Sequence, residues 1–265
     1  MLANSADKKN YVLVFVFHRA MDNAGAIIGP LMAAMFIALG VSLKNIFLIA
    51  IIPAILAVSL TFIIKEKKFT PIKTEKFNWS LKKMPKIFKR YLWAVAFFTL
   101  ACSSDMFLLL RARELGMPSY LIPILWSVVA VVTVLFSTYF SALSDKHGRI
   151  LFIGFGWLAY VLFYIFMSRL NVLGITIWFL FGFYGLFKAA TEGVERAFVA
   201  DVTKVNQRGT AFGWFNLVNG FMLFPASFIF GFIYEGYSAQ FAFLFSAISS
   251  FIAVLILINC RNKTF

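Results

Sequence analysis

The chain has 265 residues, of which 62% are hydrophobic and only 14% are charged, and its mean hydropathy is +0.86. A soluble domain is roughly half apolar and about a quarter charged, so this composition excludes an ordinary soluble protein and indicates a membrane protein. The formal net charge of +14 does not indicate nucleic-acid binding, because the basic residues lie between apolar segments and not in one basic stretch.

Eight apolar segments are long enough to cross a hydrocarbon core about 30 Å thick. Seven contain no charged residue along most of their length, and the eighth requires one acid, Asp105, to lie within the membrane. The segments lack the alternation of a barrel strand and exceed its length, so we expect an all-α integral membrane protein with about eight transmembrane helices. The expected helices are 12–39, 45–64, 91–110, 120–140, 150–168, 172–191, 209–234 and 241–260.

The Lys and Arg residues are distributed unevenly between the two sides of this expected bundle. An even number of helices places both termini on one side, and 19 basic residues then fall on that side against 4 on the other. The positive-inside rule therefore predicts a multi-pass protein of the cell (inner) membrane with both termini in the cytoplasm.

One expected cytoplasmic connection, residues 65–90, is long and strongly basic. Apolar residues recur in it at helical spacing among the lysines, which would suit a segment lying on anionic headgroups. A solvated linker between two helical bundles is the alternative. The recurring residues are Phe77, Leu81, Met84 and Phe88.

Residues that carry enzymatic or metal chemistry are few. The chain has two His and two Cys, without zinc-ligand spacing, a nucleotide-binding loop or a metalloprotease motif. We therefore expect no enzyme activity, no cofactor and no metal. The expected partners are the lipid bilayer, a small solute of unknown identity and protons.

A short polar stretch, SALSDKHGR at residues 141–149, separates two of the expected helices. It resembles the loop signature of the major facilitator superfamily, with Ser141 where that signature has its first glycine. The matching residues are Leu143, Asp145, Lys146, Gly148 and Arg149.

Two further stretches are similar to motifs of the same family. The sequence GAIIGPLMAA at residues 25–34 resembles the antiporter signature of the family's fifth helix, through Gly25, Gly29 and Pro30. Small residues of this kind let a neighbouring helix approach closely, and proline bends the helix. Residues 191–213 resemble the segment that joins the family's tenth and eleventh helices.

The order of these motifs implies that the chain corresponds to family helices five to twelve, a truncated form of the fold. Residues 1–64 would then be the last two helices of the N-terminal bundle, 65–90 the cytoplasmic linker, and 91–265 the six-helix C-terminal bundle. The resemblance implies a secondary active transporter of a small solute that works by alternating access, with proton-coupled efflux favoured by the antiporter-like motif. The alternative is a non-transporting fragment or remnant that needs a partner with the missing helices.

Charged residues within the expected helices are the candidate site residues, because a charge in lipid is unfavourable and normally faces protein or water. Asp105 either binds a proton or substrate, or pairs with Arg111 or Arg113 near the interface. Arg19 and Asp22, three residues apart, either neutralise each other near the headgroups or face a polar cavity.

A second group of charges lies near the end of the expected helix 172–191. Lys188, Glu192 and Glu195 share one helical face with Arg196, and form either a cytoplasmic charge cluster or part of a substrate site.

The family resemblance also implies a role for the aspartate of the loop signature, which is thought to bind the positive end of a nearby helix. We therefore predict that Asp145 lies near the N-terminal turn of the first helix, at residues 10–14, and that Arg149 faces Glu192 and Glu195. A solvated turn without such contacts is the alternative.

Overall fold

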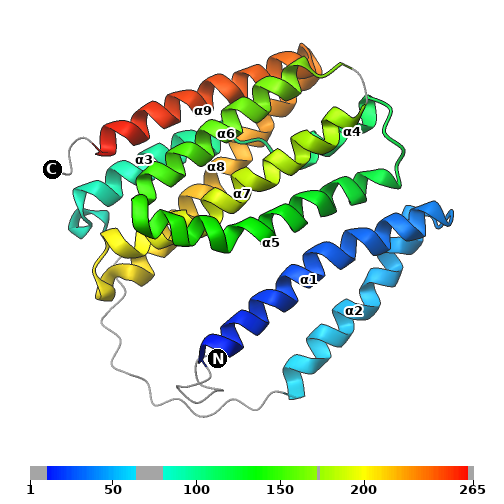
Figure 1. The fold of residues 1–265 in the computed structure, drawn as a ribbon, viewed down its shortest axis with the longest axis horizontal. Helices are drawn as coiled ribbons and strands as arrows, with labels where there is room; N and C mark the ends of the chain where they lie inside the picture. Colours follow the sequence, from blue (N-terminus) through cyan, green and yellow to red (C-terminus); the bar gives the residue numbers. More distant parts are fainter. Residues whose placement is uncertain (1–10, 64–79, 172–173, 262–265) are drawn as a thin grey trace.

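The structure is a computed structural model that describes residues 11–63, 80–171 and 174–261, apart from the side chains of residues 11–20, 63, 83, 260 and 261. Within these ranges the regular structure is entirely helical, so the expected all-α fold is confirmed (Figure 1). The helices are α1 (Tyr11–Ala38), α2 (Leu43–Ile63), α3 (Lys86–Ala101), α4 (Met106–Glu114), α5 (Leu121–His147), α6 (Arg149–Arg169), α7 (Ile175–Val202), α8 (Arg208–Gly236) and α9 (Ala239–Arg261), with short 3-10 turns at Leu81–Lys83 and Val205–Gln207.

Seven helical segments in the described residues are long and apolar enough to cross a membrane, with α3 and α4 counted together. The remaining long helix, α7, has the length but is less apolar, because it contains the charged group that begins at Lys188. The expectation of about eight spans is therefore confirmed. Helices suit this setting because each satisfies its own backbone hydrogen bonds where no water is present.

Helices α3 to α9 form one bundle with an aromatic core. Helix α7 packs between α5 and α6, α6 packs on α9, and α3 packs on both α8 and α9. The largest fully buried side chains are mostly rings from these helices, and neighbouring rings adopt stacked and edge-on contacts. They include Tyr91, Trp157, Tyr160, Phe163, Tyr164, Phe181, Phe230 and Phe243.

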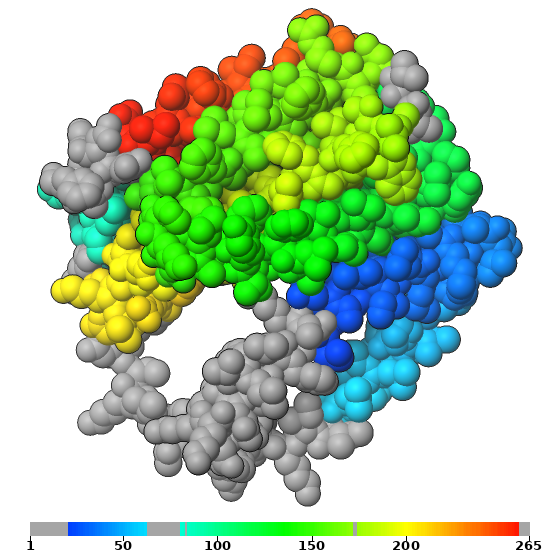
Figure 2. Space-filling view, in the orientation of Figure 1, coloured from blue at the N-terminus to red at the C-terminus, as the bar shows by residue number. Residues whose placement is uncertain are grey.

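Helices α1 and α2 lie on one side of this bundle. Helix α1 packs along α5, and α2 lies beyond α1 (Figure 1). The space-filling view shows α1 in contact with the surface of α5 (Figure 2). None of the α2 span from Leu43 to Phe62 is buried, which is compatible with a bilayer because lipid tails solvate apolar side chains.

Helices α5 and α7 approach each other closely at Gly185. A Cβ atom added at Gly185 would lie 2.8 Å from Val132 Cβ and 2.9 Å from the Val129 carbonyl oxygen. The Thr133 hydroxyl lies 3.2 Å from the Gly185 carbonyl oxygen and 2.8 Å from that of Val129. A residue without a side chain is therefore required here for the two helices to pack.

The expected close-packing role of Gly25 and Gly29 has no counterpart among the described residues. No described atom lies within 4 Å of a Cβ built on either glycine, and both residues are exposed. The role proposed for these glycines and for Pro30, inside α1, therefore stays a prediction.

The polar stretch at residues 141–149 is mostly helix and not loop, which corrects the expected helix end at residue 140. Helix α5 continues to His147, and α6 begins at Arg149, so Gly148 alone separates them. Gly148 has φ +97°, a conformation that favours glycine. The expected end was wrong because charged residues stop a membrane span but do not stop a helix that continues into water.

The expected single helix 91–110 is divided in two, and it begins earlier. Helix α3 starts at Lys86, directly after Pro85, and ends at Ala101; four non-helical residues precede α4. Met84 and Phe88 are buried in the bundle core, so these two residues do not lie on headgroups. Phe77 lies outside the described residues.

Candidate functional site

The interruption between α3 and α4 consists of Cys102, Ser103, Ser104 and Asp105. Short polar side chains compete with the backbone for hydrogen bonds, which disfavours continuous helix. The Ser103 hydroxyl lies 3.0 Å from the Tyr164 hydroxyl on α6, and the Met106 N–H donates to the Ser104 hydroxyl at 3.3 Å. Irregular backbone at membrane depth is tolerated when it is enclosed by protein in this way.

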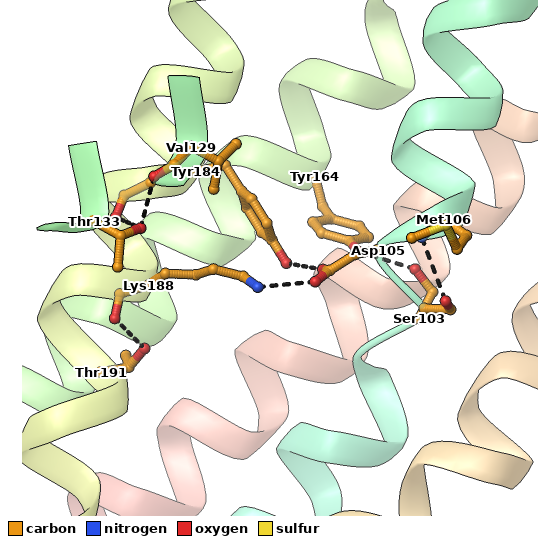
Figure 3. Close-up of polar contacts among 11 residues, drawn as sticks. Ser103, Asp105, Met106, Val129, Thr133, Tyr164, Tyr184, Lys188 and Thr191 are labelled. Atoms are coloured by element: carbon orange, nitrogen blue, oxygen red, sulfur yellow. Dashed lines mark hydrogen bonds and ion pairs between the residues drawn. The ribbon is translucent and has the colours of Figure 1, made fainter. Parts of the chain in front are cut away.

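The interruption places the Asp105 carboxylate against α7 (Figure 3). Lys188 Nζ donates to Asp105 Oδ2 at 2.8 Å, and the Tyr184 hydroxyl donates to Asp105 Oδ1 at 2.5 Å. The side chains of Asp105 and Lys188 are 28% and 23% exposed. Each carboxylate oxygen therefore has its own donor in a half-buried setting.

Aromatic rings further enclose the Lys188 ammonium. Its Nζ lies 5.1 Å from the centroid of the Trp126 ring and 5.6 Å from that of the Tyr184 ring. Both distances are within the range of cation–π attraction. Lys188 is also the fourteenth residue of the 28-residue helix α7, so the pair lies near the middle of that helix.

Of the two interpretations of Asp105, pairing with Arg111 or Arg113 is wrong. Asp105 pairs with Lys188, whereas Arg111 donates to the Leu170 carbonyl oxygen at 2.8 Å and pairs with Glu114 at 3.4 Å. The Tyr234 hydroxyl also donates to Glu114, at 2.6 Å. A separate polar group therefore joins α4, α6 and α8 at the other end of α4.

A cavity of about 420 Å³ lies beside the Asp105–Lys188 pair. Its walls come from α3, α6, α7 and α8, and they combine aromatic, aliphatic, amide and carboxyl groups. The lining residues are Val95, Phe98, Thr99, Cys102, Trp157, Phe187, Lys188, Thr191, Glu192, Glu195, Asn219, Gly220 and Leu223.

Two acids of α7 line this cavity, and they differ in their surroundings. Glu195 is half-buried and accepts a hydrogen bond from the Trp157 Nε1–H at 2.9 Å. Glu192 is exposed, and no described residue forms an ion pair with it. Lys188, Glu192 and Glu195 therefore belong to the cavity wall and do not form only a surface charge cluster.

A polar contact also crosses the cavity wall between α3 and α8. The Thr99 hydroxyl donates to Asn219 Oδ1 at 2.8 Å. This bond leaves the amide NH₂ of Asn219 as a donor.

The residues predicted on α1 do not join this site. Asp22 is exposed and does not line the cavity, and the side chain of Arg19 lies outside the described residues. Among the described residues, no group of three or more His, Cys, Asp or Glu could hold a metal ion.

The residues of the loop signature lie at the junction of α5 and α6, and the predicted partner of Arg149 is wrong. Arg149 pairs with Asp145 at 2.9 Å and, through Nε, with Asp201 near the end of α7. It does not face Glu192 and Glu195, because α7 continues to Val202 and brings Asp201 to this junction. Leu143 is half-buried and Lys146 is exposed.

The predicted contact of Asp145 with the start of the first helix remains a prediction. The side chains of residues 11–20 lie outside the described part of the chain, and Asp145 itself is 56% exposed.

Sequence reasoning missed several residues of the site. The place of Tyr184 beside Lys188 could have been predicted, because Tyr184 precedes Lys188 by one helical turn and lies on the same helical face. The sequence carries no comparable signal for Trp126, Trp157, Thr99 and Asn219, because only the packing of separate helices brings Trp126 to Lys188 and the other three to the cavity wall.

Comparison with known proteins agrees with these features. Residues 106–263 match the family described as the Major Facilitator Superfamily. The chain belongs to the major facilitator superfamily. A similar protein, an uncharacterized MFS-type transporter of Methanocaldococcus jannaschii, is 32% identical over 255 residues. The alignment covers 92% of this chain and 63% of the relative, so the chain spans less than two thirds of the relative's length.

Membership of this superfamily has two consequences. It is a family of multi-pass membrane transporters and not of enzymes, which agrees with the composition and with the long apolar helices. In this chain, the Asp105–Lys188 pair and the adjacent cavity together form the candidate transport site.

Proposed function

We propose that the chain forms the solute- and proton-binding part of a secondary active transporter in the cell membrane, with both termini in the cytoplasm. The observation that carries this proposal is the interrupted helix α3–α4, which holds Asp105 against Lys188 beside a cavity with aromatic and carboxyl groups in its wall. Transporters commonly bind substrate and coupling ions at interrupted helices near the bilayer midplane.

The pair provides a way to couple a proton to a movement of helices. When Asp105 is ionised, it holds Lys188 and Tyr184 of α7 against the start of α4. When a proton binds at an Asp105 carboxylate oxygen, the ion pair is lost, and the neutral carboxyl group keeps only weaker hydrogen bonds to the Lys188 ammonium and the Tyr184 hydroxyl. The interruption at residues 102–105 then allows α3 and α4 to move separately, which shifts the balance between two conformations.

The direction of transport is proposed as efflux of a small solute in exchange for protons. The support is the resemblance of residues 25–34 to an antiporter signature, with Gly25, Gly29 and Pro30 in place. The exposed glycine face of α1 provides a surface for another helix during such a cycle.

The test is solute-dependent proton flux in liposomes that contain the purified chain and an internal pH-sensitive dye. A panel of small cations, anions and neutral solutes is added against an imposed pH gradient. At least one solute should dissipate the gradient, and Asp105→Asn should reduce that flux by about tenfold or more, since it removes the carboxylate. Glu235→Gln, an exposed acid at the end of α8, is the matched control and should keep the flux. Equal flux in Asp105→Asn and the unchanged chain would refute the coupling role.

A second candidate function is that of a non-transporting chain that acts with a partner carrying further helices. The exposed face at Gly25 and Gly29 favours it, as does the coverage of only 63% of the relative. Absence of flux for every solute from correctly inserted chain, followed by flux when additional family helices are supplied, would favour this candidate.

A further inference from the structure

The cavity beside Asp105 has an unbalanced set of charges. Lys188 is its one basic lining residue among those described, and the Lys188 ammonium is already bonded to Asp105 and lies over two rings. The two acidic residues of the wall, Glu192 and Glu195, have no ion-pair partner among the described residues. The nearby Arg196 is exposed and does not line the cavity.

The apolar part of the cavity wall consists largely of aromatic faces. Phe98 stacks on Trp157 with ring centroids 4.2 Å apart and planes 5° from parallel, and Phe187 lies 6.2 Å from Phe98. The buried Trp157 ring donates its Nε1–H to Glu195 and so holds this carboxylate next to the aromatic part of the wall. Aromatic faces attract cations through their quadrupole, most strongly where water is excluded.

We propose that the solute bound in this cavity is a small organic cation with an apolar or aromatic body. The cationic nitrogen would lie between the carboxylates of Glu192 and Glu195, and the body would pack on Phe98, Phe187 and Leu223. The volume of about 420 Å³ is near the lower end of the range for ligand pockets, which limits the solute to a single small molecule.

An anionic solute is disfavoured by the same contacts. It would need a free donor with positive charge, and Lys188 is engaged by Asp105 at 2.8 Å. It would also lie beside two carboxylates without compensation, which is unfavourable in a half-buried site. This inference extends the proposed function to a class of solute, but the contacts that support it do not depend on proton coupling.

The test is equilibrium binding of tritiated benzyltrimethylammonium to the full chain in lipid nanodiscs, without any gradient. Neopentylbenzene, which has the same shape without the charge, and phenylmethanesulfonate, which carries the opposite charge, serve as competitors. We expect saturable binding of the cation, with competition by unlabelled cation and no competition by the anion.

The two acids are then changed singly and together. Glu192→Gln and Glu195→Gln should each weaken binding several-fold, and the double variant by about tenfold or more, because a partly desolvated charge contact is lost. Glu192→Asp keeps the charge and should retain most of the affinity. The control Glu235→Gln removes an equal charge from an exposed residue that does not line the cavity, and it should leave binding unchanged.

Several outcomes would overturn the inference. The inference is wrong if the folded chain shows no saturable binding of the cation, or if the double variant binds the cation as tightly as the unchanged chain. It is also wrong if the anion binds more tightly than the cation and the Lys188→Gln variant loses this anion binding. If the double variant does not fold, Glu192→Gln alone carries the test, because this exposed side chain forms no hydrogen bond in the described structure. The proposed function fails separately from this inference. If the cation binds and its binding depends on the two acids, but no solute is transported, the proposed function is wrong and the inference stands.

Discussion

The ion pair between Asp105 and Lys188 should couple α4 to α7 energetically. The two charged atoms lie 2.8 Å apart, which corresponds to a gross attraction of about 6 kcal/mol at an effective dielectric constant of about 20. Removing each ion from water costs several kcal/mol and offsets most of this attraction. With both side chains roughly one quarter exposed, we expect a net coupling of about 1–3 kcal/mol, within the range for residues that share one network.

A double-mutant cycle measures this coupling directly. Asp105→Asn and Lys188→Gln each leave a charged partner without its counter-ion, so each should lower the free energy of unfolding by about 2–3 kcal/mol, less than a fully buried pair. The double variant removes both charges and should be destabilised by clearly less than the sum of the single variants. Unfolding is followed by tryptophan fluorescence during SDS titration in mixed micelles.

The exposed pair Asp145–Arg149 provides the matched control. Its N–O distance is 2.9 Å, nearly equal to that of the Asp105–Lys188 pair, but the Asp145 side chain is 56% exposed. The cycle of Asp145→Asn and Arg149→Gln should therefore give a coupling of about 0.2–1 kcal/mol. Additive effects of Asp105→Asn and Lys188→Gln, within about 0.5 kcal/mol, would refute the reasoning, because independent sites behave in that way.

Three further predictions concern the backbone and the topology. Gly148→Ala should lower the free energy of unfolding by about 1–3 kcal/mol, measured in the same titration, because φ of +97° is strained for any side chain; an unchanged midpoint would contradict this. Gly185→Ala should cost about 1–3 kcal/mol by forcing α5 and α7 apart, whereas Gly182→Ala, where nothing lies within 4 Å, should cost little, and equal effects would argue against close packing at Gly185. Reporter fusions after residue 76 should show a cytoplasmic location and those near residue 116 an external one, and an external signal at residue 76 would invert the proposed topology.

The class of protein and the positions of most helices could be predicted from the amino-acid sequence alone. Apolar segments of sufficient length are a local property of the chain, and a bilayer requires each to satisfy its backbone as a helix. For this reason the expected spans agree with α1, α2, α6, α8 and α9 to within a few residues. Helix ends in water were less predictable, because charged residues such as Lys146 continue α5 where the bilayer no longer limits it.

Which charges meet, and where helices touch, depends on the packing of the bundle and could not be predicted from the sequence. Asp105 and Lys188 are 83 residues apart, and their pairing depends on the interruption of α3–α4 and on the packing of α7. Gly25 and Gly29 carry the more familiar motif, yet no described atom lies close to them, whereas Val132 of α5 lies directly opposite Gly185. Electrostatic attraction and steric contact depend on distances in space, and those distances are set by the whole bundle and not by any single segment.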